Sequence, residues 1–202
     1  MIAVESVTEV TPELVEVFER LMPQSHPTLP PPTRLELEQV VTGELLGVHE
    51  EGEGADTRIV NRSFLVSDAG VVVASYDKIH MFDVTLPDGK VIRESSAYRP
   101  GDKAVTADTP LGRVGLTICY DLRFPQLFRT LAQAGAQIIT VPSSFQRQTG
   151  KAHWHALLQA RAIENGCWII APAMCGAHAG NRQTFGHSLV VNPWGEVVAD
   201  GG

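Results

Sequence analysis

Val114-Gly-Leu-Thr-Ile-Cys-Tyr-Asp-Leu-Arg-Phe-Pro125 begins as an apolar run of strand character that ends abruptly at Cys119. A polar turn follows the cysteine, and Pro125 stands where the first turn of a helix accepts proline. This order predicts a strand, a turn and a helix, with the thiol at the carboxyl end of the strand. A helix N-terminus there would favour a thiolate and a developing oxyanion. Free cysteines are among the most buried residues, so Cys119 taken alone favours a core position instead.

Strands and helices alternate on the C-terminal side of this stretch. We expect helices over 124–134 and 152–165, and buried strands over 137–141 and 167–171. Continuous apolar strands that alternate with helices predict a sheet covered by helices. Shorter strands with turns between them are expected over 59–66, 71–76, 104–109, 186–191 and 196–199. They add antiparallel hairpins, so the predicted fold class is α/β with mixed sheets.

Residues 1–45 carry weaker signals. Thr11 and Pro12 suit the start of a helix, as N-cap and first helical residue. The segment 23–32 is rich in proline and cannot form regular structure. A short helix over 35–41 and a strand over 45–49 complete this part of the prediction.

Composition excludes several classes of protein. The 202 residues have a hydrophobic content of 44%, a charged content of 19% and a net charge of −7. This balance is ordinary for a globular protein and argues against a general nucleic-acid binder, which needs a basic surface. We find no membrane-spanning run and no signal-peptide pattern. Cys119, Cys167 and Cys175 form an odd set, which favours reduced thiols and a cytoplasmic setting.

A cysteine nucleophile needs a base and a group that stabilises the oxyanion. One possibility is a histidine base, and the candidates are His80, His153 and His187. The other is a carboxylate base with a lysine near the developing charge, for which the candidates are Lys78, Glu94 and Glu13. Taken singly, each of these charged residues is more typical of an exposed surface position. Spacing alone leaves both possibilities open.

Several motifs resemble, in order, the signatures of the nitrilase superfamily of carbon–nitrogen hydrolases. They are Tyr76-Asp-Lys-Ile-His-Met-Phe-Asp83, Arg93-Glu-Ser95, Pro100-Gly-Asp102, Cys119-Tyr-Asp-Leu-Arg-Phe-Pro125, Thr149-Gly-Lys-Ala-His-Trp154, Arg161-Ala-Ile-Glu-Asn165 and Gly186-His-Ser-Leu-Val-Val-Asn-Pro-Trp-Gly-Glu196. The resemblance runs from about residue 58 to the end. It implies an αββα sandwich and a Glu–Lys–Cys catalytic triad. Within the superfamily, the chain is most similar to amidases that act on deaminated glutathione.

The resemblance implies a role for each member of the triad. Cys119 matches the nucleophile that forms a thioester, and Lys78 matches the lysine that stabilises the oxyanion, together with the backbone N–H of Tyr120. Glu94 matches a second glutamate that holds the lysine. Glu13, in Thr11-Pro-Glu13, matches the general base. Candidate substrate-binding residues are Tyr120, Arg147, His153 and Trp154.

The resemblance also implies a homodimer and a small-molecule amide substrate, either an ω-amide or a deaminated-glutathione-like amide, with no metal or organic cofactor. The His153-Trp-His155 pattern is too short to indicate a metal site. We expect a single domain over 1–202 in which 1–45 is atypical. Compared with the family, the chain looks truncated at both ends, without the family's final strand and helix.

Two alternatives follow from these observations. One is a Cys–His hydrolase, and the other is a catalytically impaired homologue that serves as a binding or assembly module. Among the remaining residues, Asp121 and Arg123 are expected to pair or cap near the turn, and Cys167 to lie in the core.

Overall fold

A six-stranded mixed sheet forms the centre of the computed structural model, which describes residues 41–48, 58–67, 72–86, 89, 91–178 and 182–202. Its strand order is β13-β12-β9-β8-β7-β6. The strands are β6 (Val105–Thr109), β7 (Gly112–Leu116), β8 (Ile138–Thr140), β9 (Trp168–Ala171), β12 (Leu189–Val191) and β13 (Val197–Asp200). The central strands β7, β8 and β9 run parallel, and the outer strands pair antiparallel. The predicted mixed sheet is therefore confirmed.

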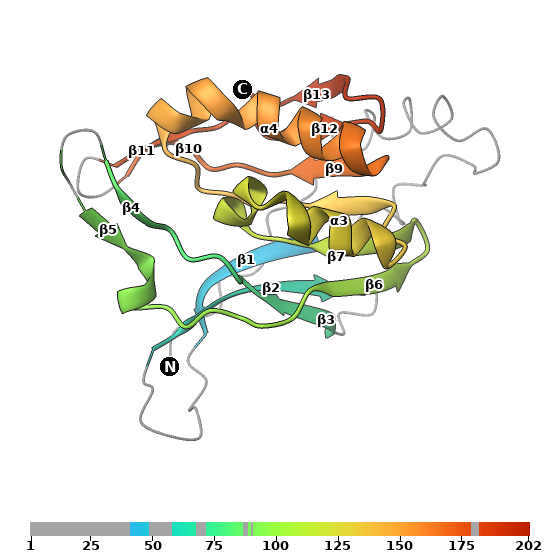
Figure 1. Cartoon of the computed structure of the whole chain (residues 1–202), viewed down its shortest axis with the longest axis horizontal. Helices are drawn as coiled ribbons and strands as arrows, with labels where there is room; N and C mark the ends of the chain where they lie inside the picture. The colour runs from blue at the N-terminus through green and yellow to red at the C-terminus, as the bar shows by residue number, and fades with distance from the viewer. Residues whose placement is uncertain (1–40, 49–57, 68–71, 87–88, 90, 179–181) are drawn as a thin grey trace.

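Two helices, α3 (Pro125–Gln133) and α4 (Arg147–Asn165), lie side by side over one face of this sheet (Figure 1). Pro125 is the first residue of α3, as the sequence predicts. The buried face of α3 consists of Leu127, Phe128 and Leu131. Gly166 ends α4 in the left-handed conformation, with φ 63°. The helix over 152–165 is thus confirmed, although it begins earlier, at Arg147.

A second sheet consists of β1 (Val41–Val48), β2 (Val60–Val66) and β3 (Val72–Asp77), all antiparallel. Leu65 of β2 and Tyr76 of β3 belong to the same buried cluster as the central strands of the larger sheet. The two sheets therefore share one hydrophobic core. Since a buried aliphatic side chain contributes about 1.5–3 kcal/mol, this shared core holds the sheets together.

Two short hairpins occur where the sequence predicts no strands. They are β4 (Asp83–Thr85) with β5 (Val91–Arg93), and β10 (Cys175–Ala177) with β11 (Gln183–Phe185). Each strand has three residues and most of its side chains are half-buried or exposed. Such strands leave no recognisable alternation of apolar and polar residues. The β4–β5 hairpin leads directly into a 3₁₀ turn, η1 (Glu94–Ser96), which carries a predicted site residue.

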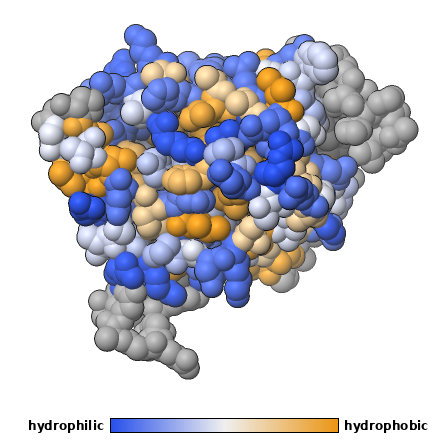
Figure 2. Space-filling model, viewed as in Figure 1, coloured by the Kyte–Doolittle hydropathy of each residue, from blue (hydrophilic) through white to orange (hydrophobic). Residues whose placement is uncertain are grey.

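The architecture is α/β and agrees with the prediction from the sequence. Within the described ranges, α3 and α4 form a helical layer on the six-stranded sheet. The predicted helix at Thr11 and residues 35–40 of the helix predicted over 35–41 lie outside the described residues, and Val41 belongs to strand β1 instead, which begins four residues earlier than the strand predicted over 45–49. No helix in the ranges given above combines the length and apolar character needed to span a membrane. Figure 2 shows hydrophilic and hydrophobic residues interspersed on the face that carries α3 and α4.

Candidate active site

Cys119 occupies a sharply bent position just after β7. It begins the 3₁₀ turn η2 (Cys119–Arg123), and its φ of 48° lies in the left-handed region. This conformation costs a residue other than glycine roughly 1–2 kcal/mol. The Cys119 N–H donates to the carbonyl of Pro142 at 2.9 Å, which helps to hold the bend. The half-buried thiol is therefore presented at the end of the strand, as a nucleophile on a strained turn is in other hydrolases.

The carboxylate of Asp121 holds this turn in place. It is fully buried, and Oδ2 accepts the Ile118 N–H at 2.9 Å and the Tyr76 hydroxyl at 2.7 Å. Oδ1 accepts the backbone N–H of His80 at 3.1 Å and lies 2.7 Å from its Nδ1. A buried carboxylate is tolerated only when such partners replace water. Asp121 thus joins the turn of Cys119 to the segment that follows β3.

Tyr76 remains a neutral donor in this network. Burial, together with the charge of Asp121 and the hydrogen bond to it, raises the pKa of the Tyr76 phenol above its ordinary value. The same hydroxyl oxygen accepts the N–H of Ile79 at 3.3 Å. One phenol therefore bridges the end of β3 and the turn of Cys119.

Lys78 and Glu94 form a buried ion pair. The Lys78 side chain is 3% exposed, and its Nζ lies 2.8 Å from Oε1 and 2.6 Å from Oε2 of Glu94. The backbone N–H of Phe82 also donates to the Glu94 carboxylate. Both charges are compensated by direct hydrogen bonds, which a buried pair requires. The structure therefore brings together two predicted site residues: Lys78, which follows β3, and Glu94, which begins η1.

The backbone of Lys78 is held on both sides. Its N–H donates to the backbone carbonyl of Asn61 at 2.9 Å, and its own carbonyl accepts the N–H of Gly101 at 2.9 Å. A Cβ atom at position 101 would lie 2.3 Å from the carbonyl oxygen of Asp77. Only glycine fits this approach, which explains why a glycine follows Pro100 at this point.

Ring contacts connect the ion pair to the turn of Cys119. The His80 ring stacks on Phe124 with 3.6 Å between ring centroids. The Phe82 ring meets the edge of Tyr120 at 4.9 Å. Because the Phe82 N–H also donates to Glu94, the lysine–glutamate pair and Tyr120, which follows Cys119, are held by the same short segment.

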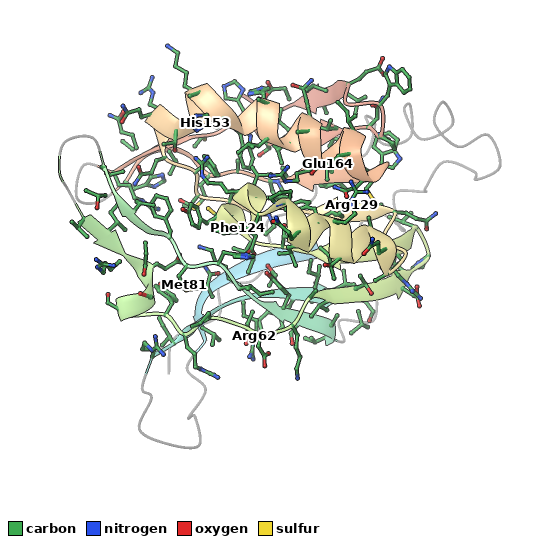
Figure 3. All side chains as sticks on the ribbon, in the orientation of Figure 1. Arg62, Met81, Phe124, Arg129, His153 and Glu164 are labelled. Atoms are coloured by element: carbon green, nitrogen blue, oxygen red, sulfur yellow. The ribbon has the colours of Figure 1, made fainter. Side chains whose placement is uncertain are left out.

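Residues of α4 approach the turn from the other side. Arg123 lies 3.3 Å from Nδ1 of His153, which is exposed on α4 (Figure 3), and its guanidinium lies over the ring of Phe145. Arg123 therefore pairs with His153. Trp154 is fully buried against Phe145, and its indole N–H donates to the carbonyl of His187 at 2.8 Å. The structure places Trp154 in the packing behind the site.

Arg147, the first residue of α4, is exposed, and its guanidinium donates to the side-chain oxygen of Gln183 at 3.2 Å. Gly150 lies in the next turn of the helix, where a Cβ atom would come within 2.4 Å of Phe185. The start of α4 is therefore packed tightly against β11, which sets the direction in which Arg147 leaves the helix.

The predicted site residues have different outcomes. Glu13 lies outside the described residues, so its role as base remains a prediction. Asp121 caps the turn, as expected, but its bonds to Tyr76 and His80 escaped sequence reasoning. The sequence motif that could have indicated these bonds is Tyr-Asp-Lys-Ile-His. Its first and last residues, Tyr76 and His80, each lie two positions from Lys78, and both contact Asp121.

The other two cysteines lie in different environments. Cys167 is buried, with its Sγ 3.1 Å from the Ala136 carbonyl, and burial raises the pKa of its thiol. Its predicted core position is confirmed. Cys175 is exposed on β10.

Comparisons with known proteins agree with this geometry. The deaminated glutathione amidase of Yersinia enterocolitica is 51% identical over 142 residues, which cover 69% of this chain and 49% of that protein. The crystal structure of the C. elegans NitFhit protein superposes with a TM-score of 0.72 at 41% identity, covering 83% of this chain and 41% of that one. The chain spans about half the length of the curated relatives it matches.

A third comparison concerns the cysteine. A mutant of the amidase from Nesterenkonia sp. AN1, 29% identical with a TM-score of 0.63, shows Michael addition of acrylamide at its active-site cysteine. The match covers 75% of this chain and 56% of that one. The carbon–nitrogen hydrolase family profile matches residues 40–202, which include the bent Cys119 and the Lys78–Glu94 pair. The chain belongs to the carbon–nitrogen hydrolase family.

Proposed function

We propose that the protein is a cysteine-dependent amidase that hydrolyses the C–N bond of a small linear amide to a carboxylate and ammonia. The observation that carries this proposal is the buried Lys78–Glu94 pair, held by one short segment against the turn that presents Cys119. A cation fixed near a nucleophile can stabilise the negative charge that develops during acyl transfer. Since Glu94 fixes the ammonium through two short contacts, little reorganisation is needed when that charge forms.

The proposed reaction has two stages. In the first, the Cys119 thiolate attacks the amide carbonyl, and the tetrahedral oxyanion forms near Lys78 and the backbone N–H of Tyr120. Collapse breaks the C–N bond, and the proton taken from the thiol leaves with the nitrogen as ammonia. In the second, water attacks the thioester, which releases the carboxylic acid and restores the thiol. We assign the proton transfers to Glu13, and Glu94 to the positioning of Lys78.

The proposed substrate class is a deaminated-glutathione-like amide or another ω-amide. Several relatives about half identical to this chain are named deaminated glutathione amidases. Arg147 is exposed at the start of α4, where its guanidinium could meet a substrate carboxylate in bidentate fashion. Tyr120 and His153 are further candidate contacts, with Trp154 packed behind them.

The proposal also includes assembly and location. We expect a homodimer, which sedimentation equilibrium would test. Three free cysteines, one of them the proposed nucleophile, fit a reducing cytoplasmic setting.

A Cys–His mechanism is the competing proposal. Nδ1 of His80 is engaged by Asp121, and Nδ1 of His187 by Asp200 on the last strand. His153 contacts Arg123. A carboxylate on Nδ1 fixes the ring and leaves Nε2 able to act as a base, so substitution has to separate the two mechanisms. Under the proposed Lys–Cys mechanism, substitution of Lys78 should harm turnover more than substitution of His153 or His187.

The test is ammonia release from a panel of ω-amides and deaminated glutathione. Cys119→Ala is the test variant, and Cys175→Ala, which removes an exposed thiol on β10, is the matched control. We expect activity in the parent and in Cys175→Ala, with none in Cys119→Ala, and a thioester on Cys119 in mass spectra of quenched reactions. A folded parent that releases no ammonia and forms no adduct would support the binding-module alternative.

A further inference from the structure

Two histidines and an aspartate meet at the C-terminal edge of the six-stranded sheet, outside the proposed active site. Nδ1 of His187 lies 3.0 Å from each carboxylate oxygen of Asp200. Nε2 of His155 lies 3.5 Å from Oδ2 of Asp200. One ligand atom from each of the three residues lies within 4.8 Å of the others. His155 lies on α4, His187 lies two residues before β12, and Asp200 ends β13. These three elements lie together in Figure 1.

The cluster is held by its own supports. The His187 N–H donates to the Gly202 carbonyl at 2.8 Å, and the His187 carbonyl accepts the indole N–H of Trp154 at 2.8 Å. The Gly202 N–H in turn donates to Oδ1 of Asp200 at 3.0 Å. With φ at 57°, His187 takes a left-handed conformation that these bonds maintain. The imidazole is therefore directed toward Asp200 by fixed backbone contacts on both sides.

The donor spacing fits a small tetrahedral ion. Zinc binds imidazole nitrogen and carboxylate oxygen at about 2.0–2.2 Å, which places neighbouring ligand atoms of a tetrahedron about 3.3 Å apart. The two separations that involve Asp200, 3.0 and 3.5 Å, lie on either side of that value, and the ligand nitrogens of His155 and His187 lie within 4.8 Å of each other. Side-chain exposures of 37%, 33% and 35% for His155, His187 and Asp200 leave one side open, where water can complete the coordination.

The chemistry of the donors selects the class of metal. Imidazole nitrogens suit zinc and its neighbours in the first transition series, whereas magnesium and calcium prefer sites built from oxygen alone. The carboxylate of Asp200 adds one oxygen ligand to the two imidazole nitrogens, a mixed donor set that suits zinc better than magnesium or calcium.

We propose that His155, His187 and Asp200 form a binding site for one Zn²⁺ or a similar divalent transition-metal ion, which fastens α4 to the last hairpin of the sheet. The site takes no part in the proposed amide hydrolysis. The other two ligands, His187 and Asp200, are distant from His155 in the sequence, so the short His153-Trp-His155 pattern did not indicate this site. His153, two residues away on the same helix, contacts Arg123 and lies outside the cluster.

Isothermal titration calorimetry with ZnCl₂ tests this proposal. The 202-residue chain is prepared without a polyhistidine tag, treated with a chelator and dialysed, and carries Cys119→Ala and Cys175→Ala so that neither thiol binds the ion. We expect one equivalent of Zn²⁺ to bind this parent, with no comparable signal from MgCl₂. His155→Ala and Asp200→Asn should each weaken Zn²⁺ binding about 10-fold or more, since each removes a ligand.

His153→Ala is the matched control and should bind Zn²⁺ as the parent does. Alanine favours helix at position 155, so circular dichroism should show that His155→Ala folds like the parent. Titration with CoCl₂ gives a second readout, because the visible absorption intensity of a four-coordinate site should appear in the parent and be lost in His155→Ala. Absence of a saturable equivalent in the parent, or equal affinities in the parent, His155→Ala and Asp200→Asn, would overturn the proposal.

Discussion

The hydroxyl of Tyr76 donates a 2.7 Å hydrogen bond to the buried carboxylate of Asp121, across 45 positions of the sequence. This bond joins β3, which Lys78 directly follows, to the turn that begins with Cys119. The same carboxylate accepts the N–H of Ile118, directly before the cysteine. The two sides of the proposed active site are therefore held in register by one buried acceptor.

Substitution of Tyr76 by phenylalanine should destabilise the protein in a pH-dependent way. At pH 7 we expect a loss of about 1–3 kcal/mol, because Asp121 loses a donor in a buried site. The raised pKa of Tyr76 means that its contribution is complete below the unfolded tyrosine pKa of about 10. Above that pH Tyr76 ionises in the unfolded parent, which stabilises the unfolded state and lowers the parent's free energy of unfolding. Tyr76→Phe has no phenol at this position and does not show this loss.

Urea unfolding of the parent and Tyr76→Phe at several pH values from 7 to about 10.5 measures this difference. The gap between the two free energies of unfolding should narrow at the alkaline end. A gap that stays constant or widens would show that Tyr76 titrates normally in the folded state.

Breaking the Lys78–Glu94 pair should cost both activity and stability. Lys78→Met should lower kcat about 100-fold or more if the ammonium stabilises the oxyanion. It should also destabilise the fold by about 3–5 kcal/mol, because the 12% exposed Glu94 is left as a buried charge without its partner. Ammonia release and urea unfolding measure the two effects separately.

The double variant Lys78→Met with Glu94→Gln separates these effects further. It removes both charges while the amide oxygen can still accept the Phe82 N–H, so part of the lost stability should return and the activity should not. Recovery of activity along with stability would mean that Lys78 acts only through the fold.

The three cysteines should react differently with iodoacetamide in the native protein. Cys175 is exposed and Cys119 is half-buried, whereas Cys167 is buried and has a raised pKa. Since the thiolate is the reactive form, peptide mapping after brief labelling should find adducts on Cys119 and Cys175 only. Cys167 should become labelled once urea is present, and native labelling of Cys167 at a rate like that of Cys119 would contradict its core position.

Gly101→Ala should disturb the site from a distance. The new methyl group would lie 2.3 Å from the Asp77 carbonyl oxygen, so the chain at Lys78 must shift. We expect a fall in kcat and a lower unfolding midpoint. Gly201→Ala is the control, because a Cβ atom there meets its neighbours at ordinary contact distances of 3.4 Å and more. Equal behaviour of the two variants would show that the close approach at Gly101 does not position Lys78.

Local patterns in the sequence were sufficient for the order of elements around the site. The apolar run before Cys119, Pro125 at the first position of α3 and Gly166 after α4 each report a local backbone preference, and each holds in the structure. Strand β8 was equally predictable from its continuous apolar residues. The β4–β5 and β10–β11 hairpins were not predicted, because a strand of three residues is too short to show a periodic pattern of apolar side chains.

The sequence by itself therefore determined the α/β class, the position of Cys119 at a strand end and, through its motifs, the pairing of Lys78 with Glu94. Only the tertiary structure decided which side chains Asp121 binds and which residues His155 meets. The physical reason is that a backbone preference depends on neighbours along the chain. A contact between side chains dozens of residues apart depends on strand register and helix packing, which the whole core sets together.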